Sequence, residues 1–268
     1  MEESLFISYA ITACNEFLEL DNLLDFIQKN MEEDDEVVVQ VDSDKVTSKV
    51  LSVLEKYKES FFLEDLDFKV IEFSLNNDFA SFKNNLNSNC SKDYIFQIDA
   101  DEIPSEFLIN NIHYILSSNS NIDVFSVPRI NVVRGITENH ILKWKWSLSK
   151  LENMIEAETM PINSEYYKLL NKINFIIYEG EDLNSDDPNG RVVNYYVPII
   201  NFPDFQTRIY KNKETIFWAG KVHEVIRSTE NIFYANLDPV DYYSLIHIKD
   251  ISRQENQNKF YEKFNSSN

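Results

Sequence analysis

Short apolar runs alternate with longer amphipathic stretches along the first part of the chain. Runs rich in β-branched and aromatic residues are typical of buried strands, and apolar residues spaced three or four positions apart are typical of helices. This alternation predicts a parallel, right-handed, doubly wound α/β sheet. The expected strands are 5–12, 36–41, 68–73 and 94–98, and the expected helices are 18–27, 46–57 and 79–86, the last capped by Asn77 or Asp78.

The remainder of the chain is less regular. Pro104 is expected to end the strand 94–98 and to open a helix near 105–116. No internal repeat or low-complexity linker divides the sequence, which predicts one domain over residues 1–268. We further expect a strand pair or bent strand at 122–133, helical stretches within 152–178, a polar loop at 181–190, a hairpin of 205–210 with 215–218, and a polar terminal helix at 254–264.

Three acids follow the strand 94–98 directly, at Asp99, Asp101 and Glu102. Open α/β sheets bind their ligands at the carboxyl ends of the strands. Hard oxygen ligands spaced one residue apart suit Mn²⁺ or Mg²⁺, held partly by the phosphates of a substrate. A plain acidic turn is the alternative for a bare D-x-D motif.

The charge and cysteine content exclude some classes of protein. The chain has 25 basic and 45 acidic residues, so its net charge of −20 disfavours a general nucleic-acid or anionic-membrane binder. Cys14 and Cys90 give neither a disulfide framework nor a zinc spacing, and we expect reduced core thiols. Without an expected signal peptide or membrane span, the prediction is a cytoplasmic protein. Four glycines and no G-x-G-x-x-G disfavour a dinucleotide site.

A set of short segments occurs in an order typical of one enzyme family. These are Asn15-Glu16 and Asp42 at strand ends, Lys83-Asn84, Asp99-Ala100-Asp101, residues 201–210 (NFPDFQTRIY), residues 218–224 (WAGKVHE), and His247-Ile248-Lys249 with Gln254, Gln257, Asn258 and Tyr261. Over roughly 6–261, the set resembles the family-2 nucleotide-sugar glycosyltransferases of the GT-A fold. The resemblance implies a Rossmann-like, mostly parallel sheet flanked by helices, with a nucleotide-sugar-binding half at 1–103 and an acceptor-binding, catalytic α+β half at 104–268.

The resemblance also implies a donor site. Asp42 would accept hydrogen bonds from the base, Thr12 and Asn15 would line its pocket, Lys83 would approach the diphosphate or base, and Asp99 would contact the ribose or the metal. Each residue has a structural alternative: a helix cap for Asp42, turn chemistry for Thr12 and Asn15, and a solvated side chain for Lys83. Cys14 stands where the family often has an aromatic residue, which removes a ring that would stack on the base.

The metal and the acceptor would involve other residues. Asp101 would ligate Mn²⁺ or Mg²⁺, and His247 would return as a further ligand or be an ordinary buried histidine. An inverting transfer needs a carboxylate that accepts the proton of the acceptor hydroxyl, and Glu224 is the candidate, with a surface glutamate as the alternative. His223 would bind phosphate or simply pack, and Trp218 would lie on the acceptor side.

Trp144 and Trp146 alternate, so on a strand they would share one face. Trp146 would then belong to a stacking platform for a sugar or base on the acceptor side, and a core cluster is the alternative. His113 and His140 match no motif and are expected to be structural.

The resulting prediction is a metal-dependent, inverting hexosyl- or pentosyltransferase. It would move a sugar from a nucleotide-diphosphate sugar, expected to be a UDP-sugar, to a hydroxyl of a glycan, protein or small molecule. One alternative is transfer to hydroxymethylated nucleic acid, which the net charge disfavours. Another is a non-catalytic nucleotide- or carbohydrate-binding protein on the same fold, which would need no general base. A nucleotidyltransferase would usually carry a glycine-rich phosphate loop, and the sequence has none.

Overall fold

A computed structural model describes residues 5–150, 176–181 and 191–265. The helical stretches expected within 152–178 fall outside these residues, except that 176–178 begin a strand. Most of the expected polar loop at 181–190 also lies outside them. The chain forms two compact units, Met1–Pro128 with Phe205–Leu245, and Arg129–Asp204 with Ile246–Asn268. We call them unit 1 and unit 2.

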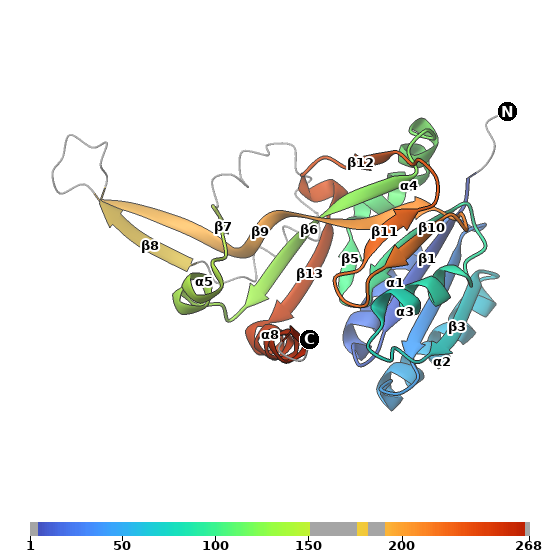
Figure 1. The fold of residues 1–268 in the computed structure, drawn as a ribbon, viewed down its shortest axis with the longest axis horizontal. Helices are drawn as coiled ribbons and strands as arrows, with labels where there is room; N and C mark the ends of the chain where they lie inside the picture. The colour runs from blue at the N-terminus through green and yellow to red at the C-terminus, as the bar shows by residue number, and fades with distance from the viewer. Residues whose placement is uncertain (1–4, 151–175, 182–190, 266–268) are drawn as a thin grey trace. The chain divides into compact units, whose positions relative to one another are not determined.

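Unit 1 contains the parallel sheet predicted from the sequence, in the strand order β3-β2-β1-β4 (Figure 1). A helix follows each of the first three strands, and each element lies within a few residues of its expected position. The elements are β1 (Ile7–Ala13), α1 (Phe17–Asn30), β2 (Glu36–Asp42), α2 (Ser48–Leu63), β3 (Asp67–Phe73), α3 (Phe79–Asn87) and β4 (Tyr94–Asp99).

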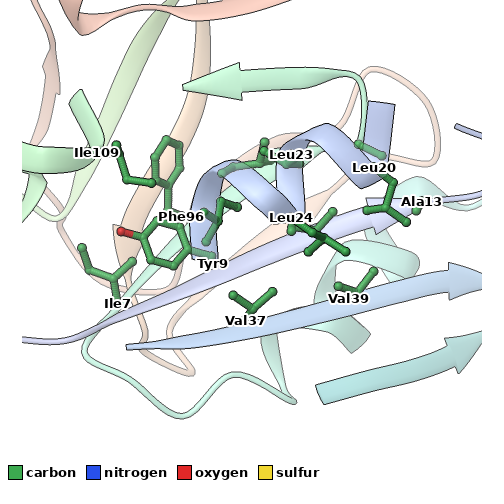
Figure 2. Packing of buried hydrophobic residues seen from close by; sticks show 14 of the residues in the cluster. Ile7, Tyr9, Ala13, Leu20, Leu23, Leu24, Val37, Val39, Phe96 and Ile109 are labelled. Carbon is green, nitrogen blue, oxygen red and sulfur yellow. The ribbon is translucent and has the colours of Figure 1, made fainter. Parts of the chain in front are cut away.

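The two faces of this sheet pack against different elements, because successive strand residues point to opposite sides. On one face the strands and the apolar stripes of α1, α2 and α4 (Glu106–Ser118) form the main core. Figure 2 shows Leu20, Leu23 and Leu24 of α1 above Val37 and Val39 of β2. Each such side chain contributes about 1.5–3 kcal/mol when it is fully buried.

The opposite face packs against α3 and a separate hairpin of β10 (Ile216–Ala219) and β11 (Val225–Ser228). Ala10, Val38 and Ile95 provide the strand side of this second core. Lys83 of α3, and Trp218 and Glu224 of this hairpin and its loop, are among the candidate site residues of the next section.

Polar side chains define where several helices begin. Asp78 caps α3 by accepting a bond from Ser81 N at 2.9 Å, as the sequence predicted. Thr47, and not Asp42, caps α2. The helix expected near 105–116 is confirmed as α4, with Ser105 as its cap, but Pro104 ends a short strand, β5 (Glu102–Pro104), that precedes the helix. Proline has no N–H to donate but fits the extended backbone of a short strand.

The hairpin expected from 205–210 with 215–218 is wrong. The first segment belongs to a long strand, β9 (Arg191–Lys211), whose end runs antiparallel to β4. The second is β10, which pairs with β11. Both segments are rich in β-branched and aromatic residues, so the sequence identified two strands but not their partners.

The elements beyond α4 complete the sheet, in which hydrogen-bonded neighbours follow the order β3-β2-β1-β4-β9-β6-β13-β5. The strand pair or bent strand expected at 122–133 is one continuous strand, β6 (Val124–Arg134), which runs through Pro128. The terminal helix α8 is polar, as expected, and the described part of the chain holds no helix long and apolar enough to cross a membrane. Apart from β9, β10 and β11, the elements after α4 are β6 (Val124–Arg134), α5 (Glu138–Trp144), β7 (Leu148–Lys150), β8 (Ile176–Glu181), β12 (Tyr234–Asn236), η1 (Asp241–Tyr243), β13 (Leu245–Asp250) and α8 (Ile251–Asn265).

Candidate active site

The candidate site begins where β1 and β4 end, with Thr12 beside Asp99 in the parallel register. Thr12 Oγ1 donates to Asp99 Oδ1 at 2.9 Å, and Gln97 Nε2 donates to the same oxygen at 3.0 Å. The other oxygen, Oδ2, accepts from Arg208 Nη2 at 2.6 Å. Asp99 is therefore held from both sides, with its side chain 35% exposed.

Arg208 organises these acids, and the sequence analysis did not identify it. Its side chain is 4% exposed, and Nη2 also lies 2.6 Å from Glu102 Oε1, while Nη1 donates to Gln97 Oε1. Glu102 is fully buried, and its Oε2 accepts from Asp99 N at 3.2 Å. The available signal was an arginine beside the apolar pair Ile209-Tyr210 in a strand, because such a charge needs a buried acid as its partner.

The charges in this network shift the pKa values of its members. Burial alone would raise the pKa of Asp99, but Arg208 and Lys83 hold it well below its usual range. Burial alone would lower the pKa of Arg208, but Asp99 and Glu102 raise it above its usual value. Both groups are therefore charged at neutral pH.

Asp42 ends β2, and the two oxygens of its carboxylate differ in their hydrogen bonds. The residue is 3% exposed. Its Oδ1 accepts from Asp44 N and from Leu75 N, both at 3.2 Å. Its Oδ2 is buried without a hydrogen-bond partner among the described residues. Because such an atom costs about 1–3 kcal/mol, this oxygen favours a ligand N–H or O–H donor.

Lys83 and Glu224 form a close ion pair within unit 1. Lys83 Nζ lies 2.6 Å from Glu224 Oε1, and the two side chains are 9% and 16% exposed. The ammonium also lies 4.3 Å from the centroid of the Trp218 ring, a cation–π contact. Lys83 is therefore not the solvated lysine, and Glu224 not the surface glutamate, that were the structural alternatives.

Asn84 joins the elements that carry this pair. Its side-chain amide donates to Trp218 O and accepts from Trp218 N, both at 2.8 Å, so α3 is bonded to β10. The N–H of Phe79 adds a bond to Lys221 O at 3.0 Å. Trp218 itself is 4% exposed and donates from Nε1 to Tyr210 Oη at 3.0 Å. A role for Trp218 on the acceptor side of the site stays a prediction.

The loop between β10 and β11 presents Glu224. Gly220 has φ 98°, a conformation that disfavours any side chain, and the exposed His223 also has a positive φ, 57°.

At the end of β1, Asn15 is exposed, and the Glu16 carboxylate accepts from the N–H groups of Cys14 and Asn15 at 2.9 Å. Cys14 and Cys90 are free thiols and only partly buried, so neither is a full core residue.

The predicted metal ligands lie in different units. Asp101 is a partly exposed residue of the turn after β4, in unit 1. His247 is a residue of β13 in unit 2, where its Nδ1 lies 2.8 Å from Asn131 Oδ1. Asn131 also donates to Asp204 at 2.8 Å, beside a 2.7 Å ion pair from Arg129. Among the described residues, no group of three or more His, Cys, Asp or Glu side chains could hold a metal ion.

The tryptophan pair does not lie on a strand, so that prediction is wrong. Trp144 ends α5, and Lys145 follows it in the left-handed conformation, which cannot continue a strand. The rings of Trp144 and Trp146 still lie 4.7 Å apart, and His140 stacks on Trp144 at 5.2 Å. Both tryptophans are partly exposed, so the cluster is not a buried core.

The described arrangement matches a known family. The model of glycosyl transferase family 2 matches residues 8–175, and the chain belongs to this family. The α/β architecture with its mostly parallel central sheet is the GT-A fold that the sequence motifs implied. No curated protein is similar enough in sequence to count as a relative.

Three solved structures show a limited similarity to this chain. S. aureus TarS 1-349 in complex with UDP is 15% identical, with a TM-score of 0.45 and coverage of 89% of this chain and 62% of that chain. Mannosyltransferase PcManGT from Pyrobaculum calidifontis, with GDP-Man and Mn²⁺, is 18% identical, with a TM-score of 0.39 and coverages of 47% and 35%. Glucosyl-3-phosphoglycerate synthase from Mycobacterium tuberculosis, with Mg²⁺ and UDP, is 14% identical, with a TM-score of 0.38 and coverages of 53% and 47%. The chain therefore spans less than two thirds of each of these three, and values this low say nothing about its donor or acceptor.

Proposed function

We propose that this chain transfers a sugar from a nucleotide-diphosphate sugar, with UDP as the leaving group, to an acceptor hydroxyl with inversion. The proposal rests on Oδ2 of Asp42, which is buried and has no hydrogen-bond partner in the part of the chain that the structure describes. A uracil-like base offers an N–H donor that this oxygen lacks. The helix cap that was the structural alternative for Asp42 is supplied by Thr47 in α2, so capping does not explain why Asp42 is buried.

Thr12, Asp42 and Asp99 form the donor side of the site. Each lies at or beside the carboxyl end of its strand, where open α/β sheets bind ligands. Residues an even number of positions apart on a strand point to the same face of the sheet. Thr12 is on the strand of Ala10, Asp42 on that of Val38 and Asp99 on that of Ile95, each an even number of positions away. Because the second residue of each pair faces α3, all three site residues point to the side that carries Lys83. Asn15 would border the base, and Lys83 would meet the diphosphate.

Asp101 fits the proposed divalent cation. Mg²⁺ and Mn²⁺ are commonly bound by one or two carboxylates, with phosphate oxygens of the substrate completing the shell. Asp101 follows the end of β4 with one residue between it and Asp99, and this D-x-D spacing suggests Asp101 as the main protein ligand. When bound, the cation would neutralise charge that develops on the leaving diphosphate.

Glu224 would be the general base. As the acceptor oxygen bonds to the anomeric carbon, the bond from that carbon to the diphosphate oxygen breaks, and Glu224 takes the hydroxyl proton. Glu224 belongs to the same compact unit as Thr12, Asp42 and Asp99. Its ion pair with Lys83 supports a position beside the diphosphate. His223, Trp218 and Trp146 remain predictions for the acceptor side.

A screen of nucleotide-sugar hydrolysis with Mn²⁺ tests the proposal. Slow hydrolysis releases the nucleoside diphosphate and identifies the donor without knowledge of the acceptor. We expect release from one UDP-sugar, with loss of release in Asp42→Ala. A chain that binds UDP but releases none from any donor would instead be the non-catalytic nucleotide-binding protein. Failure to bind any nucleoside diphosphate would contradict the proposal.

A further inference from the structure

The ammonium of Lys83 is paired with the proposed general base. Lys83 Nζ is 2.6 Å from Glu224 Oε1 and also lies over the Trp218 ring, 4.3 Å from its centroid. Lys83 is 7% exposed, so little water solvates its ammonium group. An almost buried ammonium needs an anion, and the anion in the absence of a donor is Glu224.

The two elements that carry the ion pair are bonded together. Asn84, the residue after Lys83, forms two 2.8 Å bonds with the backbone of Trp218. Phe79 N, at the start of α3, bonds to Lys221 O in the loop that leads to Glu224. Because these bonds lie on both sides of Lys83 along α3, they hold the backbone that carries Lys83 against the hairpin that carries Glu224. The parts that can move are therefore the two side chains, the lysine stem and the glutamate.

We propose that Lys83 exchanges partners during the reaction, leaving Glu224 for the diphosphate of the donor. The inference rests on the proposed function. A diphosphate carries more negative charge than a carboxylate, and lysine binds phosphate as a compact point charge. Glu224 then loses the contact that holds it against α3 and can turn to the acceptor hydroxyl. Lys83 is thus a positioning residue, which makes release of the base depend on a bound donor.

Competition for one cation has a measurable consequence. Glu224→Gln removes the competing charge, so Lys83 is more available and UDP binds more tightly, by on the order of tenfold, a coupling within the range for contacting residues. Uridine has no diphosphate, so its affinity stays unchanged. The gain disappears when Lys83→Met is added, because Met keeps the unbranched stem without the charge.

The experiment is calorimetry of UDP and of uridine with the parent chain, Glu224→Gln, Lys83→Met and the double variant. Glu214→Gln is the matched control, an exposed glutamate in the turn before β10. Melting temperatures report whether each variant is folded. If Lys83→Met does not fold, the comparison of UDP with uridine in Glu224→Gln still decides.

The partner exchange is overturned if the parent binds UDP and Glu224→Gln binds it no more tightly. It is also overturned if uridine gains as much as UDP, or if the gain survives Lys83→Met. These outcomes would overturn the partner exchange alone, and the proposed transferase function would still stand. A parent chain that binds no UDP overturns the proposed donor and the exchange together.

Discussion

Arg208 and Asp99 form a 2.6 Å ion pair at the carboxyl end of the central strand, between segments 109 residues apart in the chain. The arginine is almost fully buried, and the aspartate is bonded to β1 through Thr12. The pair therefore joins β9, β4 and β1 at the point where the donor would bind.

Arg208→Met should destabilise the fold. The change leaves the fully buried Glu102 without its counter-charge, and breaking a buried pair in this way costs about 3–5 kcal/mol. Because Asp99 is about one third exposed, its own share is smaller. Denaturant unfolding measures the difference, and Arg227→Met, an exposed arginine on β11, is the matched control. Equal losses in both variants would contradict the role of the network.

The same pair predicts how stability depends on pH. The pKa of Asp99 is lower in the folded chain than its unfolded value of about 3.9, so its contribution is complete above that value. The contribution is lost as the pH falls through the lowered folded pKa. In Arg208→Met the main source of this shift is absent, so acid unfolding should begin at a higher pH. Circular dichroism during acid titration checks this, and coincident profiles for parent and variant would count against it.

Asp42→Ala should weaken UDP binding by about 1–3 kcal/mol, because the base loses its acceptor. The change also removes the bonds to Asp44 N and Leu75 N, so a lower melting temperature is expected too. Asp44→Ala is the control, an exposed acid in the same turn that accepts from the Ser74 hydroxyl. Unchanged UDP affinity in a folded Asp42→Ala chain would reduce Asp42 to a structural role.

Asp101→Asn should remove the metal-dependent part of donor binding. The expected result is stronger UDP binding by the parent in Mn²⁺ than in EDTA, and equal binding in the two conditions by the variant. Calorimetry measures this, with Asp34→Asn, an exposed residue at the other end of the strands, as the control. The metal assignment fails if EDTA does not change the affinity of the parent chain.

Glu224→Gln should reduce sugar transfer by about 10²–10⁴-fold, the usual share of a general base. Glutamine keeps the size and hydrogen bonding of the side chain but not its basicity. Transfer rate at saturating donor measures this, with Glu214→Gln as the control. Full activity of the variant would pass the role to another acid, with Asp204 the next residue to test. Asp204 lies in unit 2, where Arg129 and Asn131 donate to it.

The sequence by itself determined the parallel half of the fold and the place of the candidate site. Apolar runs rich in β-branched and aromatic residues, and stretches with helical spacing, depend only on neighbours along the chain, so they located β1 to β4 and α1 to α3. The rule that parallel strands bind ligands at their carboxyl ends then placed Asp99 in a candidate site, and the family resemblance added Thr12 and Asp42 to it.

Tertiary structure decided which groups pair across the chain. The 205–210 segment adds to β4 and delivers Arg208 to Asp99, and α3 meets β10 so that Lys83 reaches Glu224. Neither pairing leaves a periodic signal, because register and helix–hairpin packing depend on contacts between residues far apart in sequence. A buried charge needs a partner at a fixed distance, and only the folded chain provides that distance.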